Sequence, residues 1–334
     1  MVAADDLTSG GNHRHEALMQ QLHDQYKFGE WEFGWGRFCG KDIRQVKDHS
    51  SFVSQQYYTE QKCQNRIHIP KGSQNDDLCD QAQIQVPREK VEALSWLSKE
   101  TRVDLASSVA LLMQSFPCPK ISDLKTCNKI LKEACLYKDL GIRIRPIAPE
   151  QLCIIVSSDA AWANASEAEG SHKSQAGFVV LTADRNMPQG QETEFSMIAC
   201  KSHTLERRTT STLSAETQGI VESAAVACWY PYLLAELFYS HLVSFETMDW
   251  ETMLEPLEFG VITDAKSVYD ALTSSTSNNS TTDKRTAIDL AIIREYLRRH
   301  TGCIRWIDGT VQLADSLTKH MAADFLRSVL QRGS

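Results

Sequence analysis

The sequence contains no apolar run close to the roughly 18–20 residues that a membrane-spanning helix needs. Its first residues, Met1 to Asp6, have neither the basic nor the apolar segment of a secretory signal. We therefore expect a soluble intracellular protein, cytoplasmic or nuclear, with no membrane partner. Of its 334 residues, 42% are hydrophobic and 23% are charged, which excludes collagenous and disordered chains and suffices for two modest globular domains.

The ten cysteines form no C-x-x-C pair, and they are scattered along the chain. Several lie inside apolar stretches, as reduced thiols of a protein core do. This distribution predicts a reducing compartment, and it argues against both a disulfide scaffold and a structural zinc site.

Basic residues are in deficit, with 35 Lys and Arg against 43 Asp and Glu, which gives a net charge of −8. All of this excess lies in 151–334, because 1–150 contain 20 basic and 20 acidic residues. Proteins that bind nucleic acid are usually basic, so the total charge argues against such a partner.

Two local groups of basic residues oppose that argument. Residues 284–305 contain six basic and two acidic residues. Arg294 and Arg298 share a helix face by their i, i+4 spacing. A second group precedes the helix expected from about 212. These groups supply the candidate nucleic-acid contacts: Lys201, Arg207, Arg208, Lys284, Arg285, Arg294 and Arg298. The alternative for 284–305 is a solvated helix face.

The pattern divides the chain into three regions. Residues 1–85 are polar and irregular, with short extended pieces, and 88–138 show helical periodicity interrupted by prolines, which predicts about three helices. Residues 141–150 contain two prolines and predict a linker.

From 151 onward the pattern predicts an α/β domain. Strands are expected at 153–156, 177–181, 195–199, 259–262 and 303–307, and helices at about 212–238, 265–273, 284–300 and 311–330. The order predicts a mixed five-stranded sheet that begins as an antiparallel meander, ends in parallel crossovers and carries helices on both faces. This is the ribonuclease H arrangement.

Four carboxylates occupy the strand ends and helix turns that such a sheet brings together. Asp159 lies at the end of the first strand, Glu216 early in the long helix, Asp264 at the end of the fourth strand and Asp315 in the last helix. Oxygen ligands without His or Cys favour Mg²⁺ or Mn²⁺, and two such ions would promote phosphodiester hydrolysis. The alternative is that each acid is an ordinary turn, cap or surface residue.

Five segments around these acids resemble, in order, the ribonuclease H blocks of copia-type retrotransposon polyproteins: Ser158–Ala163, Lys201–Glu216, Ile262–Ser267, Asp283–Leu290 and Ala314–Lys319. The resemblance implies that Asp159, Glu216, Asp264 and Asp315 are both the catalytic acids and the ligands of two Mg²⁺ ions, with Mn²⁺ as the alternative. It also implies an RNA–DNA hybrid as the substrate.

The upstream half is similar to the same polyproteins. Leu94–Leu105 resembles the block that follows the reverse transcriptase palm, and Asp5 and Asp6 resemble the end of the polymerase metal motif. This implies a palm remnant over 1–85, a helical thumb or connection over 86–140, a linker over 141–150 and a ribonuclease H-like domain over 151–334. The fingers and most of the palm are missing from the sequence, so we expect no DNA synthesis from this chain.

The resulting hypothesis is a truncated reverse transcriptase whose ribonuclease H domain cuts the RNA strand of hybrids, and which associates with the missing polymerase portion of the polyprotein. A degenerate or repurposed fragment that binds nucleic acid without catalysis is the main alternative. An integrase or resolvase on the same fold is a further one, although it would lack the Ala314–Lys319 block.

Overall fold

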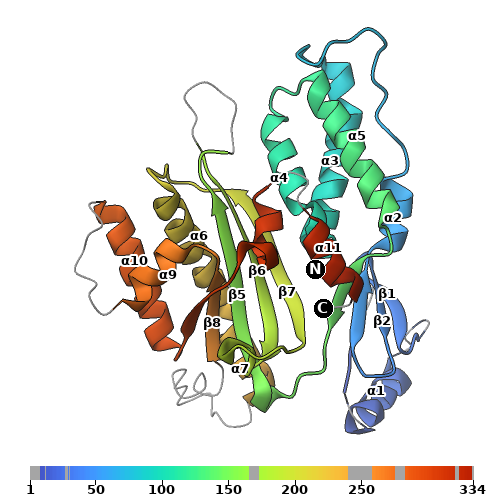
Figure 1. The fold of residues 1–334 in the computed structure, drawn as a ribbon. Helices are drawn as coiled ribbons and strands as arrows, with labels where there is room; N and C mark the ends of the chain where they lie inside the picture. The colour runs from blue at the N-terminus through green and yellow to red at the C-terminus, as the bar shows by residue number, and fades with distance from the viewer. Residues whose placement is uncertain are drawn as a thin grey trace.

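The computed structural model describes residues 8–11, 13–26, 29, 31–164, 173–239, 258–274, 283–319 and 323–332. Asp5 and Asp6, the proposed remnant of a polymerase motif, lie outside these residues. Figure 1 shows a large sheet flanked by helices, with a second group of helices and a small sheet beside it. None of the described helices is long and apolar enough to span a membrane. All ten cysteines are free thiols.

Three strands of residues 1–85 and one strand of residues 141–150 form a small antiparallel sheet in the order β1-β2-β3-β4. Its strands are β1 (Trp35–Phe38), β2 (Lys41–Gln45), β3 (Ser51–Ser54) and β4 (Gly141–Ile144), and they are accompanied by α1 (His13–Gln25) and α2 (Gln56–Lys62). The stretch predicted as a linker, 141–150, therefore begins as a strand that pairs with β3. Apolar and basic side chains alternate over 142–144, a pattern that is compatible with a β-strand as well as with an extended linker.

Three helices follow as the periodicity predicts: α3 (Gln81–Glu100), α4 (Ala106–Ser115) and α5 (Ile121–Leu136). The short 3-10 helix η1 (Val103–Leu105) leads into α4. Helix α3 starts at Gln81 because Asp80 forms a capping box with Gln83. Leucine, isoleucine and valine side chains from the three helices form one buried cluster.

The chain from 151 onward contains the predicted five-stranded mixed sheet, in the order β7-β6-β5-β8-β9. Its strands are β5 (Leu152–Ala161), β6 (Gln175–Asp184), β7 (Phe195–Thr204), β8 (Glu258–Thr263) and β9 (Cys303–Trp306). Strands β5, β6 and β7 are antiparallel neighbours, whereas β8 runs parallel to both β5 and β9. The predicted mixed five-stranded α/β sheet, which begins as an antiparallel meander and ends in parallel strands, is thus confirmed.

One face of this sheet is covered by α6 (Thr212–Ala227), with α9 (Lys266–Thr273) and α10 (Lys284–Arg299) packed beside it (Figure 1). The single helix predicted over 212–238 is wrong, because the chain breaks at Cys228 and continues as α7 (Trp229–Tyr239). Pro231 explains the break: an uninterrupted helix would need its amide to donate to Ala227, and proline has none.

The opposite face is covered by the 3-10 helix η6 (Leu313–Leu317) and by α11 (Asp324–Arg332), together with parts of the upstream region. Val103, Ala106 and Leu140 share a buried cluster with residues of β5, β6 and α11. The single helix predicted over 311–330 is also wrong. The carbonyls of Leu317, Thr318 and Lys319 accept hydrogen bonds from distant side chains, so no α-helix continues through this turn.

Candidate active site

Asp159 lies near the end of β5, where the strand is buried on both faces, and the residue is 6% exposed. The Thr318 hydroxyl donates a hydrogen bond to its carboxylate. Burial, with the nearby charges of Asp264 and Asp315, raises the pKa of Asp159 to about 6 despite the opposing effect of Thr318.

Asp264 directly follows β8, whose carboxyl end lies beside that of β5 because the two strands are parallel. The backbone carbonyl of Asp264 accepts a hydrogen bond of 2.9 Å from the Trp306 indole. The side-chain oxygen Oδ1 of Asp264 is buried and has no hydrogen-bond partner within the part of the chain that the structure describes. A buried carboxylate oxygen without a partner is costly unless a cation or water satisfies it.

Asp315 belongs to the short helix η6, not to the predicted last helix. Carboxylate oxygens of Asp159, Asp264 and Asp315 all lie within 4.8 Å of one another, although 156 positions separate the first residue from the last. The Lys319 ammonium forms an ion pair with Asp315. We call Asp159, Asp264 and Asp315 the carboxylate triad.

Glu216 lies in α6, whose N-terminus is capped by Ser211. Its Oε2 accepts a hydrogen bond of 3.1 Å from the Ala160 amide, which holds the carboxyl against the end of β5. Burial and the charges of Asp159 and Asp264 raise its pKa to about 9. Glu216 is therefore close enough to the triad for the charges of Asp159 and Asp264 to raise its pKa. It is not one of the three residues whose carboxylate oxygens lie within 4.8 Å of one another.

The triad fits a divalent metal ion. Like-charged carboxylates this close repel one another, a buried Asp264 oxygen has no partner among the residues that the structure describes, and the donor atoms are all oxygen. Hard cations such as Mg²⁺ or Mn²⁺ prefer this ligand set, whereas zinc prefers nitrogen and sulfur.

The predicted basic contacts divide into two kinds. All seven residues are exposed, and four of them, Lys201, Arg208, Lys284 and Arg285, have side chains without an ion pair to the described residues. Arg207 instead donates hydrogen bonds of 3.0 and 2.9 Å to Asp289, which joins the segment before α6 to α10. Arg294 donates to the Ala271 carbonyl, and Arg298 pairs with Glu295. Three of the seven candidates thus already have protein partners.

Several residues that touch the site had no assigned role in the sequence pattern. Gln312 hydrogen-bonds both the Ser157 hydroxyl and the Ser158 carbonyl, which fastens the chain before η6 to β5. Thr318 and Lys319 belong to the block Ala314–Lys319. Their position within four residues of Asp315 is the sequence signal that could have placed them at the site. Their contacts depend on tertiary structure.

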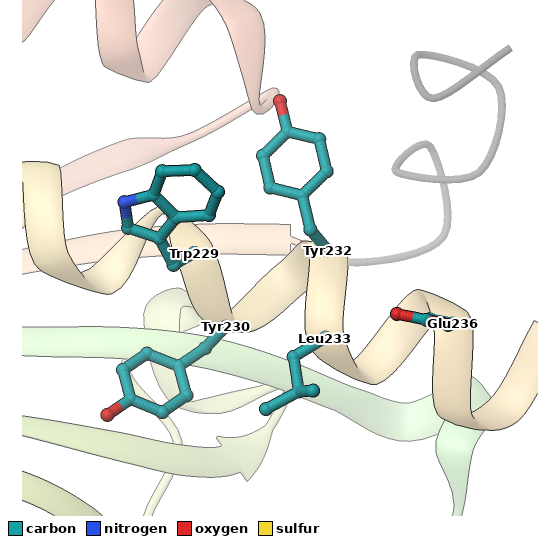
Figure 2. Close-up of a pocket in the computed structure, with 5 residues that line it drawn as sticks. All are labelled: Trp229, Tyr230, Tyr232, Leu233 and Glu236. Atoms are coloured by element: carbon teal, nitrogen blue, oxygen red, sulfur yellow. The ribbon is translucent and has the colours of Figure 1, made fainter. Parts of the chain in front are cut away.

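A separate pocket of 340 Å³ lies along α7 and is lined by Trp229, Tyr230, Tyr232, Leu233 and Glu236. Figure 2 shows these side chains spread along the helix. The lining is largely aromatic and contains one carboxylate, so it does not offer the ligand set of a metal site.

No protein-family model matches the chain, and no sequence among the curated proteins matches it. Solved structures of ribonuclease H type do resemble it. Ribonuclease H1 from the halophilic archaeon Halobacterium salinarum NRC-1 is 14% identical with a TM-score of 0.32, over 52% of this chain and 98% of that one.

Two further structures are similar at the same level. The N-terminal ribonuclease H domain of Rv2228c from Mycobacterium tuberculosis is 12% identical with a TM-score of 0.30, over 55% of this chain and 99% of that one. The protease-reverse transcriptase of prototype foamy virus is 16% identical with a TM-score of 0.31, over 57% of this chain and 22% of that one. Any assignment of the site rests on its own residues.

Proposed function

We propose that this chain is a ribonuclease of the H type that hydrolyses the RNA strand of RNA–DNA hybrids. The observation that carries the proposal is the carboxylate triad, in which acids from β5, from the end of β8 and from η6 meet, and one buried oxygen of Asp264 has no partner among the described residues. An acid serving only as a cap or turn residue would have its oxygens satisfied locally.

In this proposal Asp159, Asp264 and Asp315, with Glu216 beside them, would hold two Mg²⁺ ions. Bound divalent ions would supply the charge that activates a water molecule and stabilises the leaving oxygen. The protein residues would fix the geometry: Thr318 orients Asp159, and the Ala160 amide orients Glu216. Because its pKa is about 9, Glu216 carries a proton at neutral pH without metal, and loading the site would release it.

Hybrid binding would rest on backbone contacts and 2′-hydroxyl groups, not on base sequence. The exposed residues Lys201, Arg208, Lys284 and Arg285 are the candidates for phosphate contact. We further propose that the chain derives from a copia-type reverse transcriptase, with a palm remnant over 1–85, a thumb or connection over 86–140 and the nuclease over 151–334.

The test is Mg²⁺-dependent release of labelled RNA from a hybrid by the parent and by Asp264→Asn, normalised to folded protein. We expect cleavage to fall by about 10²–10³-fold, the scale of losing one preorganised electrostatic partner. Hybrid affinity should stay unchanged, because Lys and Arg contacts govern it. Asp270→Asn is the matched control, since Asp270 is an exposed residue of α9 paired with Lys266.

Equal cleavage by the parent and by Asp264→Asn would refute the assignment of the site. Hybrid binding without cleavage by the parent would favour the second hypothesis, a repurposed fragment.

A further inference from the structure

The turn that follows Asp315 is held by side chains from three separate parts of the chain: a strand, a helix and the loop after β5. Ser202 of β7 donates a hydrogen bond of 2.6 Å to the carbonyl of Leu317, and Asn164 donates one of 2.9 Å to that of Thr318. The hydroxyl of Ser107 in α4 donates one of 2.8 Å to that of Lys319. Three consecutive carbonyls are thereby fixed.

This turn carries two groups of the candidate active site. The Thr318 hydroxyl bonds the Asp159 carboxylate and also the Asp315 carbonyl, the latter at 3.1 Å. The Lys319 ammonium pairs with the Asp315 carboxylate. A shift of the backbone at Thr318 and Lys319 would therefore move contacts of two triad members at once.

Ser107 is the member of this set that comes from α3, α4 and α5, which we call the helical region. It is 1% exposed, and 212 positions separate it from Lys319. A second attachment lies three residues earlier: Asp104 of η1 accepts a hydrogen bond of 3.0 Å from Arg327 of α11. Arg327 also bonds Glu133 of α5, so the chain from η6 to α11 is tied to the helices α3 to α5 by both of its parts.

We propose that Ser107 is a positioning residue of the candidate active site, and that the helical region thereby completes a site whose acids all lie after residue 150. The inference rests on the proposed function. Ser107 does not touch the carboxylates. It acts through the Lys319 carbonyl, which fixes the turn that bears Thr318 and Lys319.

The experiment compares full-length parent, Ser107→Ala and Ser98→Ala. Ser98 is a matched control because it is 3% exposed and its hydroxyl bonds a carbonyl of its own helix, Ser95. Alanine is a strong helix former, so neither substitution should weaken its helix. Two quantities are measured: the affinity for Mn²⁺ alone by calorimetry, and amide hydrogen exchange of the peptide covering 313–319 without metal.

For Ser107→Ala we expect Mn²⁺ affinity to fall about 10-fold, the lower end of the range for outer partners of metal ligands. Exchange over 313–319 should become faster, and Ser98→Ala should match the parent in both measurements. Parent-like Mn²⁺ affinity and exchange in Ser107→Ala would overturn the inference and leave the proposed function standing.

Failure of the proposed function gives a different result. A parent that binds no Mn²⁺ at the triad would overturn both the proposed function and the role of Ser107 in a metal site. Exchange over 313–319 would still report whether Ser107 holds the turn, since that measurement needs neither metal nor hybrid.

Discussion

Replacing Asp104 with alanine should destabilise the protein strongly. Its side chain and that of Arg102 are 0% and 1% exposed, and its carboxylate accepts hydrogen bonds of 2.8 and 2.9 Å from Arg102. It also accepts one of 3.0 Å from Arg327. Asp104→Ala would leave the Arg102 guanidinium with the Ala134 carbonyl and Arg327 with Glu133.

The expected loss of unfolding free energy is about 3–5 kcal/mol, the usual cost of removing one partner from a buried ion pair. This is a large share of the roughly 5–15 kcal/mol that stabilises a typical folded protein. Equilibrium unfolding of the full chain in urea would measure it as a lower midpoint. Asp76→Ala is the control, because Asp76 is 91% exposed and pairs with Lys120 at 3.3 Å.

Asp76→Ala should cost no more than about 1 kcal/mol, as exposed ion pairs do. Replacing both members of the buried pair, as Arg102→Met with Asp104→Leu, should cost less than Asp104→Ala alone, since no uncompensated charge remains between them. If Asp104→Ala and Asp76→Ala lost the same small amount, the buried ion pair would not stabilise the fold as we reason.

Two further predictions concern the site itself. Gly177→Ala should lower stability by about 1–3 kcal/mol and slow cleavage, because a Cβ there would overlap the Leu317 side chain and lie 3.0 Å from its carbonyl carbon. Gly260→Ala, which meets its nearest neighbour at 3.5 Å, is the control, and equal midpoints for the two variants would contradict the prediction. In EDTA, stability should fall as pH rises from about 4.5 toward 9, because the pKa of Glu216 is raised to about 9 and the folded state binds the extra proton. The slope should not exceed about 1.4 kcal/mol per pH unit for this proton, and urea midpoints that stay level between pH 6 and 8 would argue against it.

Much of the fold could be predicted because its signals are local. All five strands of the large sheet appear as apolar runs in the sequence, and their order with the intervening helices gives the topology. Asp159 and Asp264 could be placed because each lies at the end of such a strand.

Other features depend on contacts across long sequence separations. The break after η6 follows from side chains at Ser107, Asn164 and Ser202, none of which is visible in the pattern of 311–330. Similarly, Arg207 reads as a free basic residue until its partner Asp289, 82 positions later, is known. Periodicity reports the burial of a residue but not the identity of its partner.

The position of Asp315 so late in the sequence has a genetic consequence. A frameshift or stop codon between Trp306 and Leu313 would leave every strand of the large sheet encoded, together with Asp159, Glu216 and Asp264. Such a product would lack Asp315, the turn that bears Thr318 and the residues of α11 that share the buried cluster with Val103 and Ala106. An allele of this kind would encode neither the complete carboxylate triad nor the whole of that buried cluster.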